Sequence, residues 1–427
     1  MVSIPVPGLI YKFVQTGKRG LASEGTIGMQ KFHFYNIMKD MKELSLQIKQ
    51  QALQLGANLA GITSVERLAD SPPSGNAAAL MPGARSVISF ALALDGNKTA
   101  DFLGKRNWEP HCEDRKETVQ RLYTIGDSLV QTLESLGHRA VNVDLNNNYL
   151  PEEGAADITE MTEFHPEFSH RYAAVAAGLG RLGWSGNLMT SEYGALVELG
   201  SVITDAVLKE DPLCEENPCD GCKMCSTVCP VGMIHPRESC TVTVAGITET
   251  ISRKQPNTCC WIGCTGYEGL SPKGAWSNWS PYRLTTPLPE KKPALDALCI
   301  SLQKSDPQMQ DGDNPFADYR KTVFDPEWLY YTVCGFCRSV CVKDRAQRQE
   351  NRKLIHDSGT AALAPDGRHI KAGEDSIRVP TSFGVQVVIN PSDFTDISRI
   401  LPSQGKNSLD REVLRELWEH RSAGKPF

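Results

Sequence analysis

Residues 219–230 read CDGCKMCSTVCP, and the spacing of their cysteines decides how the rest of the chain is interpreted. The pattern C-x2-C-x2-C-x3-C-P brings three thiolates close together, so that they can wrap one face of a cubane iron-sulfur cluster. In proteins with two clusters the fourth cysteine, which precedes a proline, ligates the other cluster. The stretch therefore predicts a second group of cysteines elsewhere in the sequence.

Residues 334–341, CGFCRSVC, provide that second group. A zinc site and a set of buried thiols are the alternatives. Zinc sites usually pair two C-x2-C units and need neither the additional close cysteine nor the one before proline. We therefore predict two [4Fe-4S] clusters in a bacterial ferredoxin-like module.

Such a module usually crosses its ligands, so that the last cysteine of each run ligates the cluster of the other run. On this basis the first cluster has four ligands, namely Cys219, Cys222, Cys225 and Cys341. The second cluster has three ligands, namely Cys229, Cys334 and Cys337. One thiolate is therefore missing from the two runs.

Candidates for this eighth ligand lie in residues 257–264, NTCCWIGC. We choose Cys260 over Cys259 and Cys264, although spacing alone does not separate them. Two cysteines outside this stretch stay open as candidates, namely Cys240 and Cys299. We interpret Cys112, far upstream, as a plain buried thiol.

The chain has 427 residues, with 45 Lys+Arg, 51 Asp+Glu, a net charge of -6 and 14 cysteines. This length suffices for one large core with a second module, or for two to three domains. The mildly acidic balance gives no electrostatic support for nucleic-acid binding. The surplus cysteines fit a reducing compartment, and neither a signal peptide nor an apolar run of about 18 residues is recognisable. We therefore expect a cytoplasmic protein.

Apolar periodicity predicts alternating helices and strands, as in a layered α/β or α+β domain. Helices are expected from residue 40 to about 60 and over 114–136. Short strands are expected over 85–92, 139–143 and 196–204, where β-branched and apolar residues are dense.

Three more stretches have weaker signals. Residues 145–165 are acidic and polar, which favours a loop, and residues 408–421 have the pattern of an amphipathic helix. Trp276 and Trp279 could line a pocket, but a tryptophan pair that is either exposed or in the core is the default expectation.

Residues 170–184, HRYAAVAAGLGRLGW, are rich in alanine and glycine. Tight helix packing explains the alanines, but it does not explain the glycines at 178, 180, 183 and 186. The glycine spacing also matches a dinucleotide-binding fingerprint. We reject that interpretation because a helical pattern, not a strand, precedes it. Residues 178–194 are called the glycine block below.

The glycine block ends in GNLMTSEYG, residues 186–194, and VITD at 202–205 and the first cysteine run follow it. In this order the motifs resemble the cobalamin-dependent iron-sulfur reductases, which comprise the reductive dehalogenases and the epoxyqueuosine reductases. Residues 55–62, LGANLAGI, and 84–88, ARSVI, are similar to the N-terminal core of that family. The resemblance covers roughly residues 40–345.

The resemblance implies an α/β (α+β) fold, with a nitroreductase-like cobalamin-binding domain and an inserted two-[4Fe-4S] ferredoxin-like domain. The expected parts are an N-terminal arm over 1–40, the cobalamin-binding core over 41–205, the ferredoxin-like domain with a long insertion over 206–350, and a C-terminal extension over 351–427. Electrons would pass from the clusters to a base-off corrinoid at the glycine block. The implied cobalamin-binding residues are Tyr172, Gly178, Gly180, Gly183, Asn187, Tyr193 and Gly194.

The resemblance also implies a proton donor shortly before the glycine block, where epoxyqueuosine reductases carry an aspartate close to a proline. The equivalent stretch is EFHP, residues 163–166, so Glu163 and His165 are the candidates. A Co(I)-driven reduction consumes protons, and a histidine or a desolvated glutamate can titrate near neutrality. The chain departs from the family at Glu198, where dehalogenases often carry arginine, and at Val342, where a proline would follow the cysteine.

The function expected from these features is an oxidoreductase that uses Co(I) to reduce a small organic substrate, for example by reductive dehalogenation. The alternative is an epoxyqueuosine-type reductase acting on tRNA, which the acidic balance of the chain weakens. The cysteine runs would also suit an electron-transfer protein without corrinoid, or an activator of a separate corrinoid protein. A low-potential donor such as ferredoxin or flavodoxin is the expected partner, and no membrane span is expected.

Overall fold

The computed structural model describes residues 41–145, 149–151, 164–254, 260, 269–279, 334–363, 369–372, 377–380 and 386–389. The expected helix over 408–421, Glu163, Cys259, Cys264 and Cys299 lie outside these ranges. None of the helices in the described part of the chain combines the length and the apolar character needed to cross a membrane.

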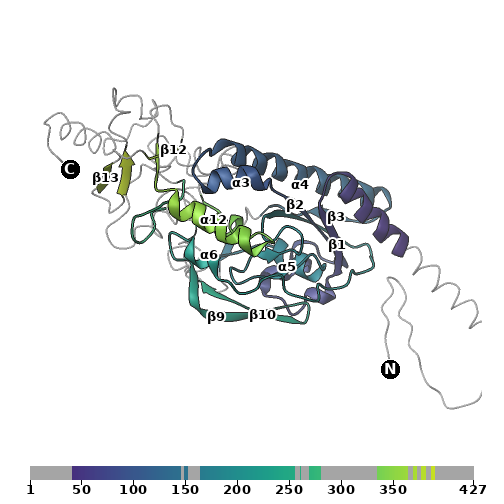
Figure 1. Cartoon of the computed structure of the whole chain (residues 1–427). Coiled ribbons are helices and arrows are strands. Elements are labelled where there is room, and N and C mark those ends of the chain that lie inside the picture. Colours follow the sequence, from purple (N-terminus) through teal and green to yellow (C-terminus); the bar gives the residue numbers. More distant parts are fainter. Residues whose placement is uncertain are drawn as a thin grey trace, which may run out of the picture.

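A four-stranded antiparallel sheet forms the centre of the molecule, in the order β1-β2-β8-β3 (Figure 1). Its strands are β1 (Leu59–Ser64), β2 (Ser86–Ala93), β8 (Val197–Thr204) and β3 (Ala140–Asn142). The three strands expected from the sequence are therefore confirmed to within two residues at each end. In the register Ile88 lies opposite Ile62 on one side and Val202 on the other, so β2 is buried between two apolar neighbours.

Helices cover both faces of this sheet, because alternate residues of a strand point to opposite faces. Ile88, Phe90 and Leu92 share a core with the helix over 41–54 and with α4 (Glu109–Ser135). Val87 and Ala91 pack with the alanines of α5 (His170–Ala176). The sheet is thus the middle layer of a mixed α/β structure, as expected.

The two long helices differ from expectation only at their ends. The apolar stripe of α4 is buried as expected, but the helix begins at Glu109, with Pro110 in its first turn. Proline suits that position because the first turn leaves its N–H groups unpaired. The first helix ends before Gly56, whose φ of 102° is left-handed, and the strand β1 begins at Leu59.

The cysteine region follows the sheet in sequence. It contains α6 (Met224–Thr227), the hairpin β9 (Ile234–Val244) and β10 (Ile247–Lys254), α11 (Phe336–Ser339) and α12 (Arg345–Asp357). In Figure 1, α12 lies beside α6, with the β9–β10 hairpin below them. Trp276 and Trp279 are buried in the core of this region, which confirms the default expectation for the pair.

The remaining elements are short. They are η1 (Glu66–Leu68), η2 (Pro73–Gly75), α2 (Ala77–Leu80), α3 (Gly96–Leu103), β4 (Tyr149–Pro151), β5 (Phe164–Pro166), β6 (Arg181–Leu182), β7 (Leu188–Met189), β11 (Ala361–Leu363), β12 (His369–Lys371), β13 (Ile377–Pro380) and β14 (Gln386–Ile389). The pairing of β4 with β5 corrects the expectation of an irregular loop over 145–165 at both of its ends. Pairing with a partner stabilised strands that have no alternating apolar pattern of their own.

Candidate iron-sulfur site

The two cysteine runs adopt the same local structure. Each contains C-x2-C-x3-C, and in each the residue after the first of these cysteines is left-handed: Lys223 with φ 58° and Gly335 with φ 90°. A helix of four residues follows in both cases, α6 and α11. Val228 and Val340, at matching positions before the last cysteine, are both fully buried. The runs are therefore a structural repeat.

The repeat explains why one ligand must come from outside the runs. Cys222 corresponds to Cys334, and the first run has one more cysteine, Cys219, three residues earlier. The corresponding position of the second run, 331, is a tyrosine. A second set of four thiols therefore needs a cysteine from another part of the chain.

One set of thiols gathers where the runs meet. Burial, followed by the charges of Cys337, Cys219 and Cys222, raises the pKa of Cys225 to about 12. Burial, followed by the charges of Cys225 and Cys219, also raises the pKa of Cys341. We call Cys219, Cys222, Cys225 and Cys341 group one.

A second set gathers beside it. Burial, followed by Cys334 and Cys337, raises the pKa of Cys229 to about 12. Burial, followed by Cys260 and Cys334, raises the pKa of Cys337 to about 11. We call Cys229, Cys260, Cys334 and Cys337 group two.

This division of the thiols follows the expected crossed ligation and stays a prediction, since Cys225 also interacts electrostatically with Cys337 of the other group. Buried thiols with raised pKa values are neutral at neutral pH, and a bound metal centre would be needed to hold them as thiolates. No three His, Cys, Asp or Glu side chains in the described ranges form a group that could hold a metal ion. The two statements are compatible, because the ligands of an iron-sulfur cluster would bind different iron atoms and need not converge on one ion.

The remaining cysteines are placed differently. Cys240 lies exposed on β9, and Cys112 is fully buried in α4, as expected for a plain buried thiol. Cys260 is half-buried and lies close enough to Cys337 to act on it electrostatically. This position supports the choice of Cys260 as the eighth ligand, which stays a prediction.

Hydrogen-bond donors surround the sulfur atoms of both groups. The backbone N–H of Trp184 donates to Cys219 Sγ at 3.3 Å, and the N–H of Met233 donates to Cys229 Sγ at 3.2 Å. Asn187 Nδ2 lies 3.8 Å from Cys337 Sγ. Hydrogen bonds to cluster sulfur atoms are one of the means by which a protein sets a reduction potential.

The glycine block packs directly against the cysteine region. A Cβ at Gly183 would lie 3.4 Å from Cys219 Sγ, and one at Gly194 would lie 2.4 Å from the carbonyl oxygen of Cys341. At Gly178, with φ 79°, and at Gly180 a Cβ would lie 2.1 Å from a carbonyl oxygen. Close packing does explain these glycines, contrary to expectation, because their missing side chains admit neighbouring parts of the chain.

The other residues expected at cobalamin lie near this block. Tyr172 is half-buried on α5, and Tyr193 accepts a hydrogen bond from Asn58 Nδ2 at 3.4 Å. The main chain of His165 lies in β5 opposite Leu150, while Glu163 is outside the described residues. The cobalamin-binding and proton-donating roles of these residues stay predictions.

A half-buried ion-pair network connects the second cysteine run to the sheet. Glu198 of β8 accepts hydrogen bonds from Arg115 of α4 at 2.9 Å and from Arg338 of α11 at 2.5 Å. Burial alone would raise the pKa of Glu198, but the two guanidinium groups lower it to about 2. The carboxylate at this position therefore balances the charge of an arginine that lies between two predicted ligands.

Two lysines lie close to group two, Lys105, which is buried, and Lys254, which is half-buried. Lys105 donates to Ser358 Oγ at 2.6 Å, and burial lowers its pKa to about 7 although Cys334 opposes the shift. Burial lowers the pKa of Lys254 to about 8, and Cys337 and Cys260 oppose that shift. Neither lysine carries a recognisable signal in the sequence, because each is distant from the cysteines of the two runs along the chain.

Comparison with known proteins identifies relatives for about half of the chain. No family model matches it. An epoxyqueuosine reductase from Bacillus cereus is 27% identical over 225 residues, covering 52% of this chain and 53% of the relative. An epoxyqueuosine reductase from Escherichia coli is 26% identical over 218 residues, covering 46% of this chain and 54% of the relative. The chain therefore spans about half the length of the curated relatives it matches, and the family resemblance of its motifs is confirmed.

Solved structures of both branches are similar to the chain at a low level. An epoxyqueuosine reductase with an epoxyqueuosine-modified tRNA stem loop has a TM-score of 0.35 at 18% identity, covering 74% of this chain and 82% of that chain. A structure described as a reductive dehalogenase with B12-dependent dehalogenation has a TM-score of 0.35 at 16% identity, covering 53% and 32%. Scores of this size do not establish a shared fold.

Proposed function

We propose that this relative of the epoxyqueuosine reductases is an oxidoreductase that passes electrons through two [4Fe-4S] clusters to a bound cobalamin and reduces a modified nucleoside in tRNA. The observation that supports the proposal is the repeated local structure of the two cysteine runs, which brings their thiols close enough to act on one another electrostatically. Cys225 and Cys337 interact electrostatically across the groups, so electron transfer between bound clusters would be short-range.

The donor set fits iron-sulfur clusters, because all its members are cysteines and most are buried or half-buried. Cobalamin has support of another kind, namely the sequence relationship. The glycine block does not offer an open cradle, since main-chain atoms occupy the space beside Gly178, Gly180 and Gly194. When bound, cobalamin would supply the low-potential metal centre that reduces the substrate, and no step proposed for the chain depends on its position.

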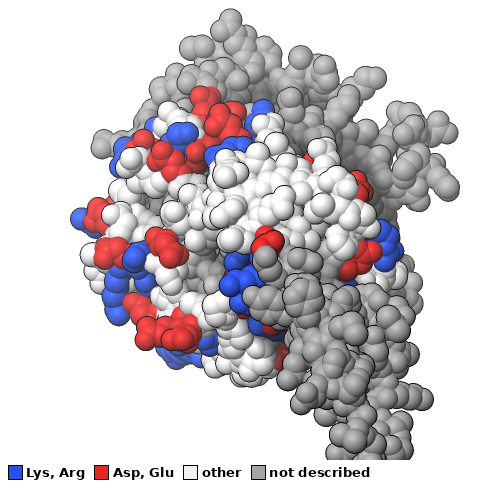
Figure 2. Space-filling view, turned by 90° about the vertical axis from the view of Figure 1, so that its right-hand side faces the viewer, with Lys and Arg blue, Asp and Glu red and all other residues white. Residues whose placement is uncertain are grey.

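The similarity to epoxyqueuosine reductases supports tRNA as the proposed substrate over a small organic molecule, which was the main expectation from the sequence. On the face shown in Figure 2, Lys and Arg are interspersed with Asp and Glu, and no continuous basic stripe crosses the described part. Binding of an RNA to this face would therefore depend on a few local contacts, with a weak dependence on salt. Glu163 and His165 are the proposed proton donors, and ferredoxin or flavodoxin is the proposed electron donor.

The test begins with anaerobic reconstitution of the full chain, followed by measurement of iron, sulfide and corrinoid. The proposal expects about eight iron atoms and about one corrinoid per chain. The loaded protein should then convert an epoxyqueuosine-containing tRNA stem loop with a chemical reductant, and leave halogenated phenols unchanged. Dehalogenation without conversion of the tRNA stem loop would refute the tRNA assignment and support a small organic substrate. Eight iron atoms without corrinoid uptake would refute the cobalamin-dependent reaction and support an electron-transfer protein.

A further inference from the structure

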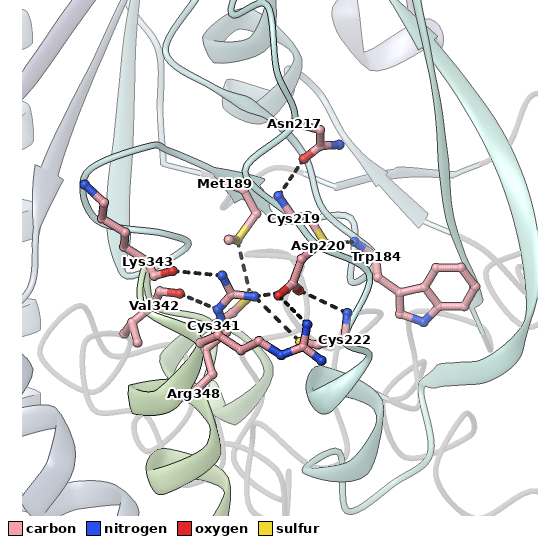
Figure 3. Close-up of polar contacts among 11 residues, drawn as sticks. Trp184, Met189, Asn217, Cys219, Asp220, Cys222, Cys341, Val342, Lys343 and Arg348 are labelled. Carbon is pink, nitrogen blue, oxygen red and sulfur yellow. Dashed lines mark hydrogen bonds and ion pairs between the residues drawn. The ribbon is translucent and has the colours of Figure 1, made fainter.

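Arg348 of α12 is a buried arginine at the edge of group one. Its side chain is 5% exposed, and Nε and Nη2 donate to the carbonyl oxygens of Val342 at 2.7 Å and Lys343 at 2.8 Å. Nη1 donates to Asp220 Oδ1 at 2.7 Å and lies 3.7 Å from Cys222 Sγ (Figure 3). The guanidinium plane is therefore held on three sides by main-chain and carboxylate acceptors.

These acceptors belong to different cysteine runs. Val342 and Lys343 follow Cys341 directly, whereas Asp220 lies between Cys219 and Cys222 and accepts the N–H of Cys222 at 3.1 Å. Arg348 thus fastens the crossing cysteine of the second run to the first run. Cys341 has two further contacts. Its Sγ lies 3.2 Å from Met189 Sδ, and its main-chain carbonyl oxygen accepts the N–H of Ala195 at 2.7 Å.

The charge of Arg348 lies beside a predicted ligand in a place where water screens it poorly. Asp220 partly balances this charge, and its own side chain is 32% exposed. A cluster gains negative charge when it is reduced. A fixed positive charge at a ligand sulfur therefore favours the reduced form and raises the reduction potential.

We propose that Arg348 is a positioning residue that closes group one and raises the reduction potential of the cluster held there. The proposal rests on the two-cluster function proposed above. Its consequence is that the group-one cluster accepts an electron from a weaker external donor than it would without Arg348. The step is a one-electron reduction of the cluster by that donor, with no bond formed or broken in the protein.

The chain offers a matched control on the same helix. Arg345 carries the same charge and contacts the other oxygen of Asp220 at 3.3 Å, but its side chain is 61% exposed and it donates to a carboxylate instead of a sulfur. The variants are Arg348→Gln, which removes the charge, Arg348→Lys, which keeps the charge without the planar fork, and Arg345→Gln. Each is reconstituted anaerobically as the full chain without corrinoid and titrated at a mediated electrode while the electron paramagnetic resonance of each cluster is recorded.

For Arg348→Gln we expect one of the two clusters to become harder to reduce. Its ratio of reduced to oxidised form at a fixed potential should fall about tenfold, which corresponds to about 59 mV for one electron. Arg348→Lys should keep the potential near that of the unaltered protein but release iron to a chelator faster, because an ammonium cannot bind all the acceptors at once. Arg345→Gln should change neither property.

The outcomes separate the two proposals. If the unaltered chain holds two clusters and Arg348→Gln shifts no potential and loses no iron, the role of Arg348 is refuted while the cluster proposal stands. An equal shift in Arg345→Gln would also refute it, since any nearby surface charge would then have the same effect. If Arg348→Gln retains only about half of the iron while Arg345→Gln retains all of it, the positioning role is supported directly. An unaltered chain without clusters would refute both proposals together.

Discussion

The sheet region and the cysteine region of this molecule are stabilised in different ways. In the sheet, seven of the eight residues of β2 are buried, and their side chains fill apolar cores on both faces. Burying one large apolar side chain contributes about 1.5–3 kcal/mol, so these contacts stabilise the sheet region without any bound group. Its regular elements are also long, with α4 extending over 27 residues.

The cysteine region also has an apolar core, which includes Trp276, Trp279 and Phe336, but the helices that carry its cysteines are short. Its helices α6 and α11 have four residues each, which is too short for a helix to be stable on its own. Thiols with raised pKa values and the charged groups of Arg338 and Arg348 occupy its interior. We therefore expect the sheet region to fold from the chain alone, and we expect the predicted clusters, when bound, to add stability to the cysteine region.

The largest effect is expected for loss of a predicted ligand. Cys225→Ser should reduce the iron content from about eight to about four atoms per chain, because Cys225 is the buried centre of group one. Cys112→Ser, at a buried cysteine of α4 outside both groups, should leave the iron content unchanged. Iron and sulfide analysis after anaerobic reconstitution measures both. Equal iron in the two variants would contradict the grouping of the thiols.

A substitution in the core of the sheet region should strongly lower the free energy of unfolding without changing the iron content. Phe90→Ala removes a fully buried ring that packs against Gly200, which should lower the free energy of unfolding by about 3–5 kcal/mol. Urea unfolding of the chelator-treated protein, followed by circular dichroism, measures this loss. The folded fraction of the variant should still bind the full amount of iron. If the chelated, unaltered protein unfolded without a cooperative transition, the sheet region would not be independently stable.

The stability contributed by Glu198, which connects the sheet region to the cysteine region, should depend on pH. The pKa of Glu198 is about 2 in the folded protein and 4.5 without neighbours, so its folded pKa is depressed. Its stabilising contribution of about 3 kcal/mol is therefore present above pH 4.5 and is lost as the pH falls from 4.5 towards 2.

Glu198→Gln should remove this dependence and destabilise the protein at pH 7 by about 3 kcal/mol, because two half-buried arginines lose the carboxylate that balances their charge. Urea unfolding of chelator-treated protein at several pH values measures both effects without the acid lability of the clusters. A matched exposed pair, Arg106 with Asp101, should contribute less than about 1 kcal/mol. The same pH profile in Glu198→Gln and in the unaltered protein would refute the assignment.

The smallest effect tests the repeat of the two runs. Lys223 is left-handed where the second run has Gly335, and its Nζ lies 3.9 Å from the centre of the Trp184 ring. Lys223→Gly and Lys223→Ala both remove this cation–π contact, but only glycine adopts the left-handed backbone conformation without steric strain. The glycine variant should therefore be about 1 kcal/mol more stable, and should lose iron to a chelator about fivefold more slowly than the alanine variant. Equal rates would show that the left-handed conformation is not required at Lys223.

Local signals made part of the structure predictable. Strand β2 is a run of apolar and β-branched residues and was found to within one residue at each end. Helix α4 has an apolar residue at every third or fourth position from Val119 to Leu133 and was found apart from its first five residues, which lack this pattern. The β9–β10 hairpin was not found. Its strand β9, IHPRESCTVTV, is mostly polar and exposed, and its turn places Ala245 at φ 57°. The carboxylate of Asp70 holds this turn by accepting the N–H groups of Ala245 at 2.8 Å and Gly246 at 2.6 Å, across 175 residues of sequence.

The sequence by itself determined which residues are predicted to hold iron, because the spacing of the cysteines within each run is a local property that decides which thiols lie close together. It also determined the alternation of helices and strands, since a strand or helix that buries one face must repeat its apolar residues with the period of its backbone. Only the tertiary structure decided that Cys260 lies close enough to Cys337 to act on it electrostatically. It also decided that Glu198 forms an ion pair with Arg338, and Arg348 with Asp220. The physical reason is that such contacts follow from how distant segments pack together, and packing at long range imposes no period or spacing on the sequence.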